Sequence, residues 1–216
     1  MNQQAVEYKH QLYKELSRVG KGLSSDKRLE ILDLLSQSPK VVDRIAQETG
    51  MSVANTSRHL QVLKDSRLVR TVKDGNHVIY QLSSPQINEL VALLVSVGEN
   101  ELSEVKMLHA RANRQEGVRT ITLGEAIDEA KQDLILDVRP TEEYQAGHID
   151  AAINIPLDSL STSLSRLPKE KTIIVYCRGR LCPYANLATQ LLNQHGFTAR
   201  SLNYSCYDWK KTTEHK

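Results

Sequence analysis

The spacing of the apolar residues changes once along this chain, and that change limits the fold more than any other feature. Over most of residues 5–113 the apolar side chains recur at intervals of three or four, which is typical of amphipathic helices. Beyond residue 118, the unbroken apolar runs LILDV and TIIVY, followed by a further strand over 198–202, alternate with helices that include 123–130 and 183–195, which is typical of parallel strands buried on both faces. Because the segment between them is polar and contains Gly117, we predict two domains, residues 1–113 and 118–216.

The composition is consistent with two soluble domains. A chain of 216 residues can supply a core to each, and 40% apolar with 25% charged residues excludes a disordered or fibrous chain. No apolar run approaches the ~18 residues of a membrane span, and the opening residues lack the apolar stretch of a signal peptide. The cysteines number three, an odd count, and all lie in the last third of the chain. We therefore expect a cytoplasmic protein with free thiols and no membrane contact.

The first domain is predicted to be mainly helical, with one β-hairpin. Helices are expected over residues 5–19, from a cap at Ser24 or Ser25 to the break at Pro39, over VVDRIAQETG up to Gly50, over 53–64 after the cap Ser52, and over 85–113. The β-prone runs RLVRTVK and HVIYQL flank Asp74-Gly75-Asn76, which is a strong hairpin signal. Two short helices about a glycine turn, followed by a hairpin, form a winged helix-turn-helix.

In such a motif the second short helix enters the major groove of DNA. We expect Val53, Leu60 and Leu63 to face inward, which leaves the polar side chains free. Basic residues outnumber acidic ones between residues 52 and 73, which suits DNA, although a solvated helix face has a similar composition. The residues predicted to bind DNA are Ser52, Asn55, Ser57, Arg58, His59, Gln61, Arg70 and Lys73.

The runs KRLEILDLL and ETGMSVANTSRHLQVLKDSRLVRTVKDGNHVIYQL resemble the ArsR/SmtB family of bacterial transcriptional repressors over residues 20–112. The resemblance implies a homodimer, built from the N-terminal helix and the 85–113 helix, that binds double-stranded operator DNA. Metal-sensing members carry two cysteines where this chain has Val41 and Asp43, and others use Asp and His pairs on the last helix, where this chain has only His109. No metal site is therefore expected, and the signal must enter elsewhere.

Cys177 follows the predicted strand TIIVY, in a turn before a helix that begins near Pro183. Backbone N–H groups at that helix N-terminus, together with Arg178 and Arg180, would favour a thiolate. We therefore expect a lowered pKa and a nucleophilic thiol at Cys177. From this local pattern alone, a buried structural cysteine is an equal alternative.

The segment LILDVRPTEEYQAGHIDAAINIP, followed by IIVYCRGRLC and a final Trp, resembles the rhodanese family over residues 118–210. The resemblance implies a doubly wound parallel α/β fold in which Cys177 accepts sulfane sulfur as a persulfide. Asp137, Glu142 and His148 match family positions and are expected to brace turns. The second loop cysteine, Cys182, stands where many relatives have Arg, Thr or Ser. The candidate catalytic residues are Cys177, Cys182, Arg139, Arg178 and Arg180, with Cys206 as a candidate third thiol on the same sheet edge.

Together these features predict a mainly α winged helix-turn-helix domain followed by an α/β rhodanese-like domain. We expect a DNA-binding transcriptional regulator, a repressor, in which Cys177 takes up sulfane sulfur or an oxidant and Cys182, with Cys206 as a further candidate, resolves the modified thiol. Two alternatives stay open: a rhodanese-type sulfurtransferase with an attached DNA-binding domain, and a regulator whose three thiols bind arsenite or a soft metal. No cofactor is expected, and the expected partners are operator DNA, a second copy of the chain, and a small sulfur species or oxidant.

Overall fold

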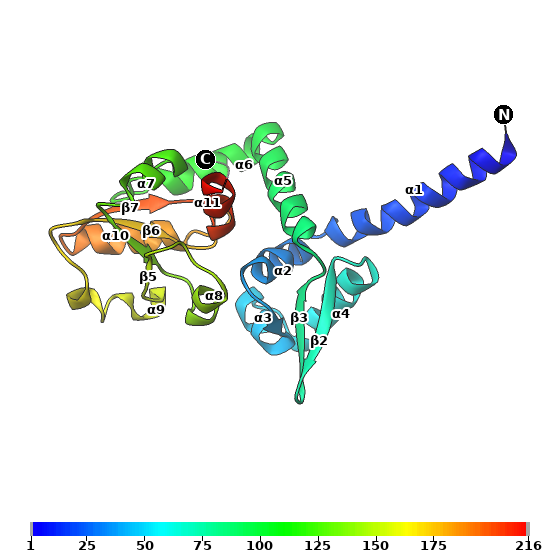
Figure 1. The fold of residues 1–216 in the computed structure, drawn as a ribbon, viewed down its shortest axis with the longest axis horizontal. Coiled ribbons are helices and arrows are strands. Elements are labelled where there is room, and N and C mark those ends of the chain that lie inside the picture. Colours follow the sequence, from blue (N-terminus) through cyan, green and yellow to red (C-terminus); the bar gives the residue numbers. More distant parts are fainter. Residues whose placement is uncertain (1, 215–216) are drawn as a thin grey trace. The chain divides into compact units, whose positions relative to one another are not determined.

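The computed structural model describes residues 2–214 (Figure 1). They form two compact units that divide between Gly98 and Glu99. Each unit has an apolar core of its own. Within the described residues, no helix is both long enough and apolar enough to cross a lipid bilayer. The predicted order, a mainly helical winged domain followed by an α/β domain with a parallel sheet, is confirmed.

The first unit is a winged helix-turn-helix. Its elements are α1 (Gln3–Leu23), α2 (Asp26–Gln37), β1 (Lys40–Val41), α3 (Val42–Thr49), α4 (Val53–Asp65), β2 (Val69–Asp74), β3 (His77–Leu82) and most of α5 (Pro85–Glu101). Ser25 caps α2 by accepting a hydrogen bond from the backbone N–H of Arg28. Gly50 ends α3 in the left-handed conformation, with φ of 66°, and so turns the chain toward α4.

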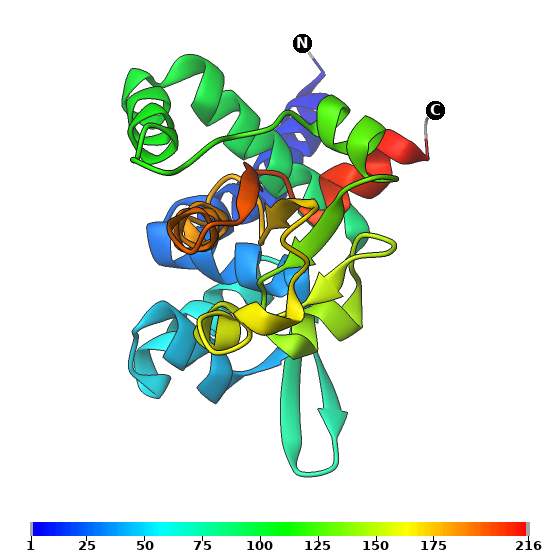
Figure 2. The same cartoon turned by 90° about the vertical axis from the view of Figure 1, so that its left-hand side faces the viewer.

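The wing is the β2–β3 hairpin, which extends away from the helices of its own unit (Figure 2). Its strands pair antiparallel up to Asp74 opposite His77, and Gly75 supplies the positive φ of 55° in the turn. Strand β1 adds to this sheet by pairing Lys40 and Val41 with β3. The sequence did not predict β1, because two residues are too few to show an alternating pattern.

Helix α4 packs on the core through Thr56, Leu60 and Leu63, which are buried. The prediction that Val53 faces inward is wrong, since this side chain is 45% exposed. Residues 56, 60 and 63 lie on one helix face at spacings of four and three, and the first turn of α4 extends beyond the core that they cover.

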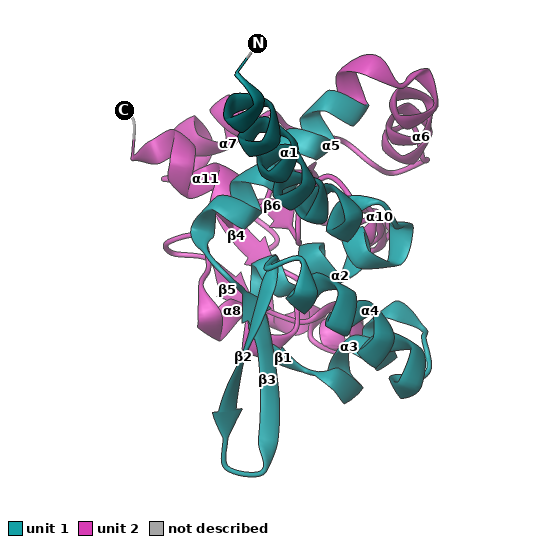
Figure 3. Ribbon diagram, turned by 90° about the vertical axis from the view of Figure 1, so that its right-hand side faces the viewer, with its two compact units in different colours: residues 1–98 teal, residues 99–216 magenta. Residues whose placement is uncertain are grey.

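The single helix predicted over residues 85–113 is two helices, α5 and α6 (Ser103–Asn113), because the chain is extended at Leu102. The Lys106 side chain donates a hydrogen bond of 2.6 Å to the backbone carbonyl of Asn100, one of the carbonyls freed by the break. Helix α5 crosses from the first unit into the second, and α6 belongs to the second (Figure 3). The sequence pattern assigned the α6 residues to the first domain, since the spacing of apolar residues continues through the break.

The second unit contains a four-stranded parallel sheet in the order β5-β4-β6-β7. Its strands are β4 (Leu134–Asp137), β5 (Ile153–Asn154), β6 (Thr172–Tyr176) and β7 (Thr198–Leu202). Its helices after α6 are α7 (Leu123–Glu129), α8 (Thr141–Ala146), α9 (Leu157–Leu160), the 3-10 turn η1 (Leu164–Arg166), α10 (Tyr184–Gln194) and α11 (Cys206–Thr213). The sequence predicted β4, β6, β7, α7 and α10, whereas β5, α8 and α11 were not predicted.

Successive residues of the strands enter opposite cores. On β6, Ile173 and Val175 pack in the core that α10 covers, while Ile174 and Tyr176 pack in the core that contains Trp209 of α11. Because all four strands are parallel, the segments that leave β4, β6 and β7 emerge at one edge of the sheet. The loop that contains Cys177 lies at that edge.

Candidate functional site

The exposed face of α4 carries the polar residues predicted to bind DNA. Ser52 caps the helix by accepting a hydrogen bond from the backbone N–H of Asn55 at 3.3 Å. Ser57, Arg58 and Gln61 are exposed, and His59 is half-buried. The structure thus places these side chains on the outer face of the second helix of the helix-turn-helix.

The wing adds two basic residues to the first unit's surface. Arg70 and Lys73 are exposed on β2, where they lie opposite Gln81 and Val78 of β3. Both side chains stand on a hairpin that the Gly75 turn closes. The helix and the wing are the two parts of a winged helix-turn-helix that can reach a duplex.

In the second unit, the loop after β6 brings two thiols together. The Sγ atoms of Cys177 and Cys182 lie 3.1 Å apart, and both residues are free cysteines. The backbone N–H of Cys182 donates to the carbonyl of Gly179 at 3.1 Å, which curls the loop. Gly179 has φ of 116°, and a Cβ there would lie 3.2 Å from the Cβ and backbone nitrogen of Ser205. The loop therefore requires glycine at this position, both for its backbone conformation and for its close approach to the start of α11.

The lower pKa of this pair belongs to Cys182. A hydrogen bond from Cys177 lowers the pKa of Cys182 to about 7, and backbone N–H groups of Tyr184 and Arg178 assist. The same hydrogen bond, together with burial, raises the pKa of Cys177. The prediction of a lowered pKa for Cys177 is thus wrong, because it did not take into account that a second, less buried thiol would ionise first.

A buried ion pair between Arg139 and Asp137 braces the edge of the sheet. The Arg139 side chain is 2% exposed, and its Nη2 donates to Asp137 Oδ2 at 2.6 Å and to the carbonyl of Gly147 at 2.8 Å. The hydroxyl of Tyr176 also donates to Asp137, at 2.5 Å. These contacts turn the Arg139 guanidinium into the interior, so the structure does not present it toward the thiols as a substrate-binding group.

Arg178 is held by a carboxylate that the sequence did not single out. Its Nε and Nη2 donate to the two carboxylate oxygens of buried Glu143 at 2.9 and 2.6 Å. The sequence assigned a bracing role to the neighbouring Glu142, which is exposed. Adjacent acidic residues on an unpredicted short helix give no signal of which one faces inward.

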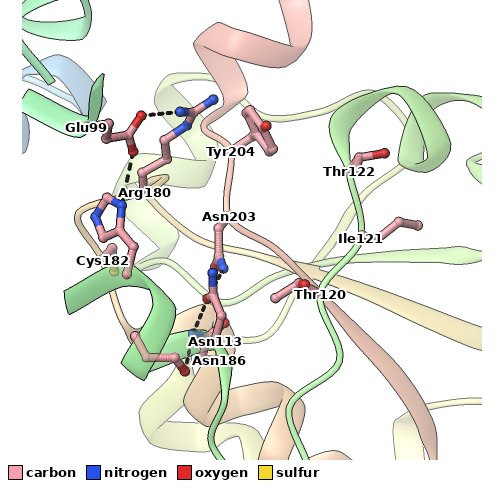
Figure 4. A pocket seen from close by; sticks show the side chains of 12 residues that line it. Glu99, Asn113, Thr120, Ile121, Thr122, Arg180, Cys182, Asn186, Asn203 and Tyr204 are labelled. Atoms are coloured by element: carbon pink, nitrogen blue, oxygen red, sulfur yellow. Dashed lines mark hydrogen bonds and ion pairs between the residues drawn. The ribbon is translucent and has the colours of Figure 1, made fainter. Parts of the chain in front are cut away.

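A pocket of about 330 Å³ lies beside the loop, within the second unit (Figure 4). Cys182 lines it, together with Arg180, which forms an ion pair with Glu99 and lies over the ring of Tyr204 with 4.6 Å from the guanidinium carbon to the ring centre. Glu99 also contacts His109 Nδ1 at 3.1 Å. The remaining lining residues are Ala112, Asn113, Thr120, Ile121, Thr122, Asn186 and Asn203. Cys177 is not among them.

Cys206 lies away from the thiol pair, although the sequence placed it on the same edge as a candidate third thiol. It begins α11 and packs with Trp209 in the core on the opposite face of the sheet from Cys177. Burial raises its pKa. The structure brings Cys177 and Cys182 together and does not bring Cys206 to them. His148, expected to brace a turn, stacks on Tyr144 with ring centres 3.9 Å apart.

Comparison with known proteins finds a family match in each of the two units. Residues 25–71 match the family described as "Bacterial regulatory protein, arsR family", and residues 122–212 match the rhodanese-like domain. The HTH-type transcriptional regulator Rv0324 of Mycobacterium tuberculosis is 36% identical over 201 residues, which cover 92% of this chain and 88% of that protein. The chain belongs to the ArsR family. It is an ArsR-family transcriptional regulator of the DNA-binding class, with a rhodanese-like domain in its C-terminal half.

Two further relatives match shorter stretches of this regulator. The arsenical resistance operon repressor of Staphylococcus aureus is 40% identical over 79 residues, which cover 37% of this chain and 76% of that repressor. Among solved structures, the homodimeric winged helix-turn-helix DNA-binding domain of Mb0332 from Mycobacterium bovis is 36% identical, with a TM-score of 0.43. The match covers 44% of this chain and 89% of the Mb0332 chain.

Proposed function

We propose that this regulator is a cytoplasmic repressor whose rhodanese-like unit senses sulfane sulfur or oxidants through the Cys177–Cys182 pair. The observation that carries the proposal is the 3.1 Å separation of the two sulfurs. A disulfide needs ~2.05 Å between sulfurs, so a movement of about 1 Å joins them. A pKa of about 7 for Cys182 makes one thiol of the pair reactive near neutral pH.

The loop is connected to the helix that runs into the first unit. Arg180 lies between the two cysteines in sequence, and its guanidinium pairs with Glu99 near the end of α5. Joining the sulfurs changes the shape of the loop, and the Arg180–Glu99 contact transmits that change to α5. Since α5 begins at Pro85 in the first unit, one continuous helix links the thiol chemistry to the DNA-binding half.

In this proposal the regulator binds operator DNA with its α4 face and its wing. The residues proposed to contact DNA are Ser52, Asn55, Ser57, Arg58, His59, Gln61, Arg70 and Lys73. A homodimer would present two such faces to a palindromic site. Exposed apolar side chains of the N-terminal helix and of α5 and α6, which the described residues of one chain leave uncovered, support this assembly: Tyr8, Leu12, Tyr13, Leu16, Leu93, Leu94, Val97, Met107 and Leu108.

A second candidate function, sulfurtransferase catalysis, is favoured by the match of residues 122–212 to the rhodanese-like domain. Steady-state turnover of thiosulfate with cyanide as acceptor would support it. The burial of Cys177, which is 1% exposed, argues against direct attack of that thiol on thiosulfate. Arsenite binding by three thiols has less support, because Cys206 lies across the sheet from the other two.

The proposal is tested by treating the reduced, full-length regulator with polysulfide, thiosulfate or peroxide and mapping its peptides without reduction. Trypsin cleaves after Arg178 and Arg180, so the two cysteines leave on separate peptides unless a bond joins them. Operator binding is measured on the same samples, with DNA that the protein itself selects from genomic fragments. We expect a Cys177–Cys182 link and an affinity change of about 5- to 150-fold, the usual range of coupling between sites. Unmodified cysteines, or modification without a change in affinity, would contradict the proposal.

A further inference from the structure

We propose that Cys182, rather than Cys177, is the thiol that first takes sulfur from the donor, and that the pocket beside it receives a low-molecular-weight persulfide or a short polysulfide. The inference rests on the proposed sensing function and assigns the order of its steps. It reverses the order that the rhodanese resemblance implies, in which Cys177 is the sulfur acceptor and Cys182 acts afterwards.

The two thiols differ in how accessible they are to a sulfur donor. Cys177 is 1% exposed and belongs to the core cluster that α10 covers, whereas Cys182 is half-buried and lines the pocket. A donor in the pocket therefore meets Cys182 first, because Cys177 does not line the pocket, and the Sγ of Cys177 lies 3.1 Å from that of Cys182.

The acidity of the pair agrees with this order. At neutral pH a thiol with a pKa of about 7 is divided between thiol and thiolate, and an attacking thiol is most effective when its pKa is near the ambient pH. The thiol of Cys177, with its raised pKa, stays protonated and donates the hydrogen bond that holds the thiolate in place.

The lining of the pocket indicates the class of donor. Its volume of about 330 Å³ is near the lower end of the ~300–1,000 Å³ usual for ligand pockets, so the donor is small. The amide of Asn203 gives one N–H to Asn113 and carries a second, and Arg180, whose guanidinium pairs with Glu99, also lines the pocket (Figure 4). N–H donors of this kind suit the anionic sulfur of a polysulfide or persulfide.

The chemistry balances in two steps. The Cys182 thiolate attacks the terminal sulfur of a protonated polysulfide. A new S–S bond forms, the outermost S–S bond of the chain breaks, and the shortened chain leaves with that bond's electron pair. Cys177 then attacks the Cys182 Sγ. The sulfane sulfur leaves as hydrogen sulfide, with one proton from the polysulfide and one from Cys177, so that the two thiols are oxidised to a disulfide while the sulfane sulfur is reduced.

The order is tested first in the wild-type protein, which avoids any question of misfolding. A substoichiometric pulse of iodoacetamide at pH 7, followed by trypsin, reports which cysteine reacts first. We expect alkylation of Cys182 to exceed that of Cys177 at least tenfold. Preferential alkylation of Cys177 would overturn the proposal.

Two variants test sulfur uptake itself, with sodium tetrasulfide as the probe. Cys177→Ala should still accept sulfur at Cys182 when assayed at pH 9, where that thiol ionises even without the hydrogen bond from Cys177, and should accumulate it as a persulfide, because no second thiol resolves it. Cys182→Ala should acquire sulfur at Cys177 at least tenfold more slowly. Rapid uptake by Cys182→Ala together with none by Cys177→Ala would reverse the assignment.

The pocket is tested by filling it. Ala112 lines the pocket from α6, and Ala112→Phe places a ring there without removing a side-chain hydrogen bond. We expect uptake at Cys182 to slow several-fold, whereas Ala110→Phe, on the same helix but outside this pocket, should react like wild type. Equal rates in the two variants would exclude the pocket as the entry route. Failure of the sensing function would look different, since wild type would then form no link or show no change in operator binding.

Discussion

At the scale of single residues, the acidity of Cys182 depends on the group that faces it. Below pH 7 Cys182 is protonated and unreactive, and above pH 7 it is a thiolate, so its alkylation rate should rise with a midpoint near 7. Cys177→Ala removes the hydrogen bond that lowers this pKa, and we expect the midpoint to move up toward the ordinary thiol value of about 8.5. Cys177→Ser keeps a donor and should give a midpoint between the two. The pH–rate profile of Cys182 alkylation measures this, and coincident profiles for all three proteins would contradict it.

The buried Arg139–Asp137 pair makes a separate prediction about stability. Arg139→Ala leaves Asp137, which is fully buried, without its ion partner. Breaking a buried pair typically costs about 3–5 kcal/mol, and we expect the free energy of unfolding to fall by that amount. Urea unfolding of the variant, beside the exposed control Lys131→Ala, measures the loss. A loss below ~1 kcal/mol would mean that Arg139 does not brace the sheet edge.

At the scale of secondary-structure elements, the polar face of α4 and the wing should account for the affinity for DNA. Arg58→Ala and Lys73→Ala each remove one exposed cation, and each should weaken operator binding and reduce the slope of log K against log salt by about one unit. Sulfur uptake should not change, because the thiols lie in the other unit. Binding isotherms at several salt concentrations test this, with Lys131→Ala as the control. Equal operator affinity in wild type and the double variant would exclude these elements as the DNA interface.

Helix α1 carries apolar side chains that no other described residue of its own chain covers. Leu12 is 44% and Leu16 57% exposed, so in the proposed homodimer they lie between protomers. Replacing both by Asp should convert the dimer to a monomer and lower operator affinity, while Lys14→Asp, which changes charge at an exposed polar position of the same helix, should leave the dimer intact. Sedimentation measures the mass. A monomeric wild type would contradict the proposed assembly.

Some helices and strands can be predicted from the spacing of apolar residues in the sequence, and others cannot. Strands β4, β6 and β7 and helices α4 and α10 follow from periodicity, because each is long enough to show a regular spacing. The break between α5 and α6 at Leu102 cannot be detected in the sequence, since the spacing of apolar residues is the same on both sides of it. Strand β5 has two residues and α8 has six, which is too short for either period to appear.

The candidate site is likewise predicted in part from the sequence. Its location follows from sequence, because a cysteine at the carboxyl end of a buried parallel strand must lie at the edge where such folds bind ligands. The contact partner of each side chain in the site does not follow from the sequence. That Arg139 pairs with Asp137, that Glu143 rather than Glu142 meets Arg178, and that Cys206 enters the opposite core all depend on packing between segments far apart in the chain.

At the scale of the whole molecule, thiol chemistry and DNA binding should be coupled through α5. Glu99 pairs with Arg180 and also lies 3.1 Å from His109 Nδ1, so Glu99→Gln keeps the shape of the site and removes the charge that holds Arg180. We expect the affinity change per linked molecule to shrink by ~0.5–2 kcal/mol, the usual effect of a coupling residue. Operator titrations of reduced and linked protein give this value, and an unchanged response would mean that coupling takes another route.

The most direct test of the central claim is a titration of the full-length wild-type regulator with polysulfide. At each step the fraction of molecules carrying a Cys177–Cys182 link is measured by mass spectrometry, and operator affinity is measured on the same sample. If the pair is the sensor, the two curves rise together, and a thiol reductant returns both to their starting values. A full change in operator affinity before any link has formed, or complete linkage with unchanged affinity, would contradict the claim.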